Sequence, residues 1–439
     1  MTRLLGKDYL PRAGIARIAS SKRRTTEANW RNSSWATFRQ SATSNRGSLD
    51  KMHIFFSVGE PSGDQHAAEL IRELRSRRPD LVASGFGGPR MQEAGCSLLY
   101  RLTDLAVMGF MRVVPLLWRF VLLSRRARSY FIERQPDAVV LVDFPGFNWW
   151  IARYAKQAGI PVFYYLPPQL WAWAPWRIRR VRRNVDHILS GLTFECDWYQ
   201  QRGVEAEFVG HPFFDEVAQH ELDQQLCDQW QTAATRNVAV LPGSRTHEVT
   251  SNFPVMVEIM RRLVSRNPEI RFLVGCYNEK QRDWCEQFLE DSDVEVAVHL
   301  FAGKTPEVIQ SSECALTVSG SVSLELLART TPSVVIYRCG RLFHLIVDFL
   351  VSCEYVSLPN LMAKRELMPE FVGSGNPEPI IAGATQVLEG WITDHHQLDS
   401  ARASLSALRD EVMQLGANAK AANEILERMP ATDSVRRAA

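Results

Sequence analysis

Short apolar runs alternate with longer stretches of helical period from residue 52 onward. This alternation is typical of βαβ units with a parallel sheet. A first series of strands is predicted at 53–58, 82–87, 138–143, 161–165, 186–190 and 207–210. A polar stretch of helical character at 216–236 separates it from a second series at 237–242, 271–276, 294–300, 314–318 and 333–337. After residue 340 we expect no further strand, and helices at 341–351 and 381–428.

Two strand series of similar size predict an α/β fold with two Rossmann-like domains that face one cleft. A length of 439 residues also suits two cores better than one. We place the first domain at 52–215, the second at 216–375, and C-terminal helices at 376–439, which either pack back or are exchanged in a dimer.

Residues 1–51 differ from the rest in composition. They hold 11 Lys and Arg against 3 Asp and Glu, whereas the remainder holds 40 against 46. The basic balance therefore belongs to this segment and gives no argument for a nucleic-acid partner. We expect the segment to be disordered or to come from an upstream start codon, and we favour the second. The eight scattered cysteines show no metal-ligand spacing and are expected to be core thiols.

Ligands of such sheets bind beyond the carboxyl ends of the strands, so residues that follow a strand are candidates. Strand 53–58 runs into Gly-Glu-Pro-Ser-Gly-Asp at 59–64. Glycine lets a backbone approach a ligand, and a helix N-terminus offers free N–H groups. The alternative is an ordinary βα turn in which Ser62 or Asp64 caps the helix.

Strand 138–143 ends at Asp143, which is followed by Phe-Pro-Gly-Phe-Asn. A carboxylate at the exit of an apolar strand is partly desolvated, which raises its pKa toward that of a useful base. In the alternative, Asp143 caps a helix that begins near Phe147.

The strongest phosphate signal is Leu-Pro-Gly-Ser-Arg at 241–245. Gly243 and Ser244 can present backbone N–H groups and a hydroxyl, and Arg245 supplies a bidentate cation. The alternative is a surface turn. Strand 314–318 runs into a second loop of small residues at 319–325, where Glu325 suits either ribose hydroxyls or the dipole of a helix.

Asp291 and Asp293 form a D-x-D pair, a spacing that can hold a divalent metal. They precede a strand, however, and are expected to be a solvated turn.

A cluster of tryptophans lies near a cluster of arginines. The residues are Trp171, Trp173, Trp176, Arg177, Arg179, Arg180, Arg182 and Arg183. Such a combination can bind nucleic acid, an anionic membrane surface or an acyl lipid.

Nine motifs follow one another in the order found in the lipid-A-disaccharide synthase family, and the chain resembles that family over roughly residues 52–428. The motifs are Gly-Glu-Pro-Ser-Gly-Asp (59–64), Gly-Pro-Arg-Met (88–91), Leu-Ala-Val-Met-Gly (105–109), Asp-Phe-Pro-Gly-Phe-Asn (143–148), Pro-Gln-Leu-Trp-Ala-Trp (168–173), Val-Gly-His-Pro (209–212), Leu-Pro-Gly-Ser-Arg (241–245), Ser-Gly-Ser-Val-Ser-Leu-Glu (319–325) and Tyr-Val-Ser-Leu-Pro-Asn (355–360). Pro61, Ser321 and Gly373 depart from the residues usual in the family, which are Ala, Thr and Gln.

The resemblance implies a GT-B glycosyltransferase. It would join UDP-2,3-diacylglucosamine to 2,3-diacylglucosamine 1-phosphate, giving a β-1,6 disaccharide and UDP, with inversion and without a metal or other cofactor. It also implies a cytoplasmic enzyme, peripheral on the inner face of the bacterial inner membrane, and a possible homodimer.

The roles implied by the resemblance combine with the residue patterns above. Asp143 and Arg245 are the predicted catalytic residues. Substrate binding is predicted for Glu60, Ser62, Gly63, Asp64, Asn148, His211, Gly243, Ser244, Ser319, Gly320, Ser321, Glu325, Asn360 and Glu366. Of these, Glu60, Ser62 and Asp64 are expected on the sugar side, and Glu325, Asn360 and Glu366 on the nucleoside.

The apolar stretch at 113–123 and the cluster Arg125, Arg126 and Arg128 are expected to contact the membrane, unless 113–123 is a core helix. Two other functions remain open: a UDP-sugar 2-epimerase of the same architecture, and a non-catalytic lipid-binding relative.

Overall fold

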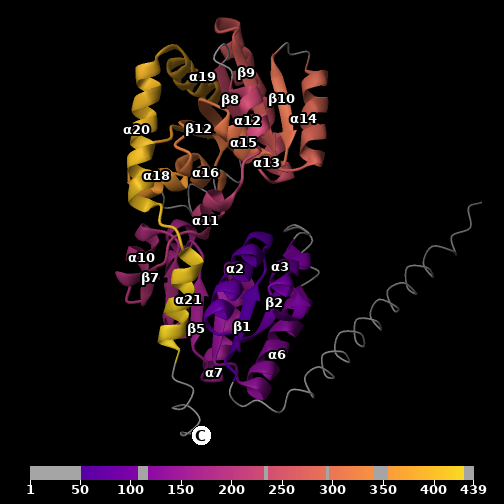
Figure 1. The fold of residues 1–439 in the computed structure, drawn as a ribbon, viewed down its shortest axis with the longest axis vertical. Coiled ribbons are helices and arrows are strands. Elements are labelled where there is room, and N and C mark those ends of the chain that lie inside the picture. Colours follow the sequence, from indigo (N-terminus) through magenta and orange to yellow (C-terminus); the bar gives the residue numbers. More distant parts are fainter. Residues whose placement is uncertain (1–50, 107–116, 232–235, 293–295, 340–353, 430–439) are drawn as a thin grey trace, which may run out of the picture.

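The computed structural model describes residues 51–106, 117–231, 236–292, 296–339 and 354–429. The segment at 1–50, the first part of the apolar stretch (113–116), Asp293 and the helix expected at 341–351 lie outside these residues. Two α/β units follow one another along the chain, each built on its own parallel sheet (Figure 1).

The first unit contains a seven-stranded parallel sheet of order β3-β2-β1-β4-β5-β6-β7. Its strands are β1 (His53–Val58), β2 (Val82–Gly87), β3 (Ser97–Arg101), β4 (Ala138–Val142), β5 (Val162–Tyr165), β6 (His187–Ser190) and β7 (Ala206–Phe208). Its helices are α2 (Pro61–Arg77), α3 (Pro89–Glu93), α4 (Thr103–Ala106), α6 (Leu117–Arg134), α7 (Pro145–Gln157), α8 (Leu170–Trp173), the 3-10 turn η2 (Pro175–Arg177), α9 (Ile178–Asn184) and α10 (Thr193–Gln200).

The second unit contains a six-stranded parallel sheet of order β10-β9-β8-β11-β12-β13. Its strands are β8 (Arg236–Leu241), β9 (Ile270–Cys276), β10 (Val298–Ala302), β11 (Cys314–Val318), β12 (Ser333–Cys339) and β13 (Glu370–Ser374). Its helices are α11 (Pro212–Gln219), α12 (Gln224–Trp230), α13 (Thr246–Arg266), α14 (Glu279–Asp291), α15 (Thr305–Gln310), α16 (Val322–Ala328), α18 (Leu358–Ala363), α19 (Glu378–Thr393) and α20 (His395–Val412), and α21 (Ala417–Arg428) follows them in the chain.

The predicted α/β fold with two parallel sheets is confirmed, and most strands begin within a few residues of their expected positions. Two strands were missed, because β3 and β13 each lie at the edge of a sheet and neither is fully buried. The expectation of no strand after residue 340 is therefore wrong. β10 is also displaced from 294–300 to 298–302.

The polar stretch expected at 216–236 is divided. The structure has α11, which begins four residues earlier at Pro212, and then α12, and the expected residues 232–235 lie outside the described part of the chain. The C-terminal segment is helical as expected, but as three separate helices.

The central strands are apolar on both faces, and helices cover both faces of each sheet. β4 is buried at every position, as a parallel strand between two helical layers requires. One face of the first sheet packs against α6 and α7, and its other face packs against α2.

Helix α21 crosses back to the first unit, although it follows the second in sequence (Figure 1). Ala421, Ala422 and Ile425 of α21 belong to the same apolar core as the buried face of α2. The buried Asp215 carboxylate, on α11, accepts hydrogen bonds from the backbone N–H groups of Gly416 (2.6 Å) and Ala417 (2.9 Å). The two places where the chain passes between the units are thereby tied together.

Candidate active site at the strand exits

Each sheet reverses its strand order once, between β1 and β4 in the first and between β8 and β11 in the second. A crevice opens beyond the carboxyl ends of strands at such a point. Val58 pairs with Val142, so Glu60 and Asp143 leave the first sheet side by side. Leu241 pairs with Thr317, which brings the 243–245 and 319–321 loops together at the second.

Asp143 lies in a left-handed turn directly after β4. Its φ is 44°, and that of Phe144 is 48°. Two consecutive left-handed residues other than glycine are costly and persist only where their surroundings hold them. The Asp143 carbonyl oxygen accepts hydrogen bonds from Asn148 Nδ2 and from the Tyr164 hydroxyl, both at 2.7 Å.

The neighbouring β1 exit is shaped to receive this turn. A side chain at Gly59 would place its Cβ 2.2 Å from the Phe144 ring, so only glycine fits there. Helix α7 begins at Pro145 with Phe144 as its N-cap, and no side chain caps it. The alternative in which Asp143 caps this helix is therefore wrong.

Burial raises the pKa of the Asp143 carboxyl above its usual value, while the Phe144 N–H and the charge of His66 act in the opposite direction. The pKa of Glu60 is also raised, first by burial and then by the charge of Asp143. Desolvated carboxylates that share a site are the environment in which one of them acts as a base near neutral pH.

Arg245 comes to this place from the second unit. Its charge lowers the pKa of Glu60, so the guanidinium lies within electrostatic reach of the first unit's strand exits. The side chain is 69% exposed, and its Nη1 lies 3.0 Å from the buried carboxylate of Glu248. A cation fixed on one side and open on the other is suited to an anionic ligand.

The 243–245 loop is braced by the helices around it. Gly243 has φ of 114°, which favours glycine, and the Ser244 carbonyl accepts from Gln281 Nε2 at 2.7 Å. Glu248 Oε2 accepts the Arg245 N–H at 3.1 Å. The loop thus presents an exposed Ser244 and Arg245 at the start of α13.

The second small-residue loop follows β11. Ser319 donates from Oγ to the Val356 carbonyl at 2.7 Å, and Gly320 and Ser321 are exposed. Glu325 is buried in α16, where burial raises its pKa and Arg329 pairs with it at 3.1 Å. Arg329 contacts only Oε1 of Glu325 in this pair, and Oε2 lies outside the contact.

Three predicted substrate-binding residues use the hydrogen-bonding groups of their side chains within the protein. Asp64 accepts the N–H groups of Gly88, Arg90 and Met91, and so caps α3 instead of α2. Asn148 bonds Ser57 as well as the β4 exit.

Asn360 is the third. It accepts from Leu367 N and Met368 N and donates to Met368 O and Glu370 Oε1. With Asp64 and Asn148, it is fully satisfied inside the protein. In this structure all three side chains hold loops of the site in place, and their substrate contacts stay a prediction.

The other predicted residues lie at the strand exits or beside them. Ser62 is exposed in the first turn of α2, whose N-cap is Glu60, while Gly63 is buried against Val58. Glu366 is exposed and accepts from the Glu370 N–H at 3.3 Å. His211 caps α11 through Nδ1, and burial lowers its pKa to about 3.

Two carboxylates of this region were not predicted. Glu370 accepts the N–H groups of Val356 and Ser357 and so fixes the 355–360 motif. Glu195, in the first turn of α10, accepts from Ser190 Oγ at 2.7 Å and Trp171 Nε1 at 3.0 Å, and burial raises its pKa to about 7. The position of Trp171 in a recognisable motif was the only signal that pointed toward Glu195.

Comparison with known proteins finds relatives that match most of the chain. The family model described as "Lipid-A-disaccharide synthetase" matches residues 54–422. A lipid-A-disaccharide synthase of Myxococcus xanthus is 35% identical over 86% of this chain and 97% of its own length. One of Anaeromyxobacter dehalogenans is 34% identical over 85% and 96%.

The chain belongs to the lipid-A-disaccharide synthetase family. It is therefore a glycosyltransferase of lipid A biosynthesis.

Solved structures of low sequence identity share the fold of this family member. The S. aureus MnaA–UDP co-structure superposes with a TM-score of 0.58 at 12% identity, covering 85% of this chain and 96% of that one. The kitacinnamycin glycotransferase gives 0.52 at 15%, covering 87% and 100%. The GT-B class predicted for the family member is thus confirmed.

The D-x-D pair of this synthetase-family chain does not follow a strand. Asp291 is the last residue of α14, ahead of β10, while Asp293 lies outside the described residues. Within the described residues, no helix combines the length and apolarity needed to cross a bilayer.

Proposed function

We propose that this enzyme transfers 2,3-diacylglucosamine from its UDP derivative to the 6-hydroxyl of 2,3-diacylglucosamine 1-phosphate, with inversion. The products are the β-1,6 disaccharide 1-phosphate and UDP. The family supports the reaction class, and the S. aureus structure of the same fold contains UDP.

The observation that carries the proposal is the convergence of opposite charges from the two units. Glu60 and Asp143 follow the paired strands β1 and β4, and the exposed Arg245 follows β8, near enough for its charge to lower the pKa of Glu60. A base and a cation on opposite sides of one crevice are what an inverting transfer of a diphosphate-activated sugar needs.

In this mechanism the acceptor's 6-oxygen attacks C1 of the donor sugar, and the bond from C1 to the diphosphate oxygen breaks. Asp143 takes the proton from the attacking hydroxyl. Arg245 and the N–H groups at the start of α13 neutralise the charge that develops on the departing UDP. His66, whose charge acts on Asp143, lies next to His211, with ring centroids 6.3 Å apart.

The donor's nucleotide would lie over the second sheet. Ser244, Ser319, Gly320 and Ser321 supply hydroxyls and N–H groups there, and the Glu325 oxygen that does not contact Arg329 suits a ribose hydroxyl. Asn360 acts indirectly, because its hydrogen bonds keep the 355–360 motif in place.

Membrane attachment is proposed through α6. Phe120 and Leu123 of this helix are buried, so one side of it belongs to the core. Trp118, 50% exposed, and Leu122 lie on its other side. An amphipathic helix with outward apolar residues and the nearby Arg125 and Arg128 suits the interface of an anionic membrane.

The deciding experiment supplies both diacylglucosamine substrates and identifies the products by mass spectrometry. We expect a disaccharide 1-phosphate and one UDP per disaccharide. Incubation with UDP-N-acetylglucosamine alone tests the epimerase alternative, since an epimerase converts that substrate without an acceptor. No product in either assay would leave the non-catalytic lipid-binding alternative and refute the proposal.

A further inference from the structure

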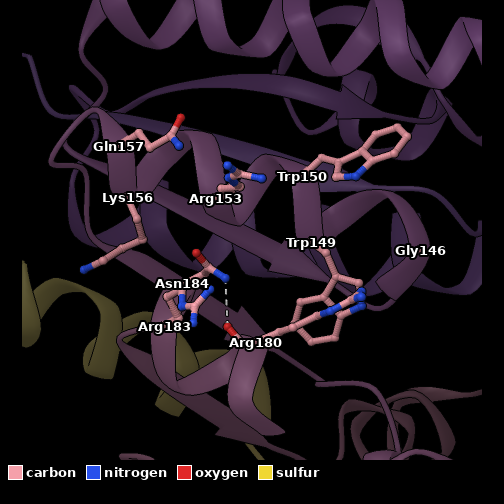
Figure 2. Close-up of a pocket in the computed structure, with 9 residues that line it drawn as sticks. All are labelled: Gly146, Trp149, Trp150, Arg153, Lys156, Gln157, Arg180, Arg183 and Asn184. Atoms are coloured by element: carbon pink, nitrogen blue, oxygen red, sulfur yellow. Dashed lines mark hydrogen bonds between the residues drawn. The ribbon is translucent and has the colours of Figure 1, made fainter. Parts of the chain in front are cut away.

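A groove lies on the first unit between α7 and α9. Its volume is about 720 Å³. Figure 2 shows the residues that line it: Gly146, Trp149, Trp150, Arg153, Lys156, Gln157, Arg180, Arg183 and Asn184. No substrate role assigned above involves these side chains.

The groove is strongly cationic. Lys156 pairs with Asp186 at 2.6 Å, but Arg153, Arg180 and Arg183 make no ion pair within the described part of the chain. In Figure 2 the Arg180 side chain extends from α9 toward Trp149. Three uncompensated guanidinium groups around one concavity create a field that attracts an anion.

Trp149 adds an unused hydrogen-bond donor. Its side chain lines the groove and is almost fully buried, and its Nε1 has no partner within the described residues. A buried N–H without an acceptor is costly. An anionic oxygen held between Arg180 and Trp149 would supply that acceptor.

The surroundings of the groove are apolar as well as basic. Helix α6 packs on α7, and α7 packs on α9, so the three helices cover one face of the sheet. Trp118 and Leu122 of α6, Trp150 of α7 and Trp176 beside α9 are exposed there. Aromatic residues next to cations are typical of surfaces that meet the headgroup layer of a bilayer.

We propose that this groove binds the phosphate of an anionic membrane phospholipid. Arginine binds phosphate bidentately, and the exposed tryptophans would enter the acyl boundary around the headgroup. Exposed apolar side chains lie beside the cations. A lipid bilayer can bury such side chains among its acyl chains, whereas the grooves and phosphates of a nucleic acid cannot, so a lipid is favoured.

The position of the groove gives it an orienting role. Gly146, at its edge, is three residues after Asp143 at the start of α7. A headgroup held along α7 and α9 would fix the first unit against the bilayer, with the crevice at a set height. The inference rests on the membrane attachment proposed above, but not on the reaction.

The test uses the full-length protein and vesicles of phosphatidylcholine, with and without phosphatidylglycerol. The paired change Arg180→Gln and Arg183→Gln should lower the partition onto phosphatidylglycerol vesicles about 10-fold or more, since each cation near an anionic surface contributes severalfold. The matched control is Arg72→Gln with Arg78→Gln, which removes the same charge from exposed positions on and next to α2, on the other face. It should change the partition far less.

Trp149→Phe keeps the ring and removes only the N–H. We expect weaker binding to phosphatidylglycerol vesicles with an unchanged or higher melting temperature. Turnover of detergent-dispersed substrates should stay at the wild-type level in all groove variants. Absence of turnover in the wild type would refute the proposed reaction and leave the vesicle result to stand by itself.

Equal losses in the groove and control pairs would show diffuse attraction and overturn the proposal. Full retention of vesicle binding by the groove pair would overturn it too, and if Trp118→Ser with Leu122→Ser then abolished binding, attachment would belong to α6 alone. Tighter binding to a single-stranded oligonucleotide than to anionic vesicles, lost in the groove pair, would assign the groove to nucleic acid instead.

Discussion

Asn148 donates a hydrogen bond from Nδ2 to the backbone carbonyl of Asp143, and the two atoms are 2.7 Å apart. The same amide also reaches the carbonyls of Ser57 and Val142, so it joins the exits of β1 and β4. The position of the Asp143 carboxylate therefore depends on backbone contacts, and its side chain can be changed without undoing the turn.

Asp143→Asn should lower kcat by about 10²–10⁴-fold, because an amide cannot take the proton of the acceptor hydroxyl. Asparagine tolerates the left-handed conformation well, so the melting temperature should not fall. Steady-state kinetics and thermal unfolding of the one variant measure both. Turnover within a few-fold of wild type would move the base to Glu60.

Arg245→Ala should lower kcat on the order of 100-fold, comparable to the loss of one preorganised donor to a developing charge. Arg245→Lys should recover only part, because an ammonium cannot reproduce the planar fork. Arg266→Ala is a suitable control, since it removes an exposed arginine from the other end of α13. Equal activity of the Arg245→Ala and Arg266→Ala enzymes would mean that Arg245 is a surface residue.

Glu195 makes the stability of the fold depend on pH. Its pKa is about 7 in the folded protein and 4.5 in the absence of burial, so between these values the folded state holds a proton that the unfolded state has released. Stability should therefore fall as pH rises from about 4.5 to 7, by roughly 1 kcal/mol per pH unit, and level off above.

Glu195→Gln removes this dependence, because a glutamine can serve Trp171 and Ser190 without ionising. Denaturant unfolding of both proteins at several pH values measures the difference, which should grow in favour of the Gln variant up to about pH 7. Parallel stability curves across that range would contradict the protonated state of Glu195.

Activity should survive an excess of EDTA. In the proposed mechanism Arg245 and the start of α13 neutralise the diphosphate, and Asp291 of the D-x-D pair ends a helix ahead of β10 instead of following a strand. Turnover is measured before and after chelation and after magnesium is returned. If chelation abolished turnover and magnesium restored it, a metal ion and not Arg245 would neutralise the diphosphate.

The sequence predicted the fold well where burial decides it. The β4 run Ala-Val-Val-Leu-Val is apolar throughout because both of its faces are covered, and it was placed to within one residue. β13, Glu-Phe-Val-Gly-Ser, was missed because it lies at the edge of its sheet and is only partly buried, so its sequence is less apolar. Pattern alone does not distinguish such a segment from a loop.

The positions of the candidate loops follow from the strand pattern, whereas the orientations of the side chains within them do not. Asp143, Arg245 and Glu60 follow their strands as expected. Asp64, Asn148 and Asn360 stand in the same motifs but turn inward, because N–H and carbonyl groups distant in sequence need them as partners. Those partners, such as Met91 for Asp64, become visible only when the chain is folded.

The return of α21 to the first sheet has a consequence during synthesis. The face of the first unit that Ala421 and Ile425 cover is complete in sequence at β7, yet its last layer is translated some two hundred residues later. At about 5–20 residues per second the ribosome needs roughly 10–40 s to reach it. For that interval the nascent first unit exposes an apolar face, and chaperones that shield such faces have a defined window in which to act on this chain.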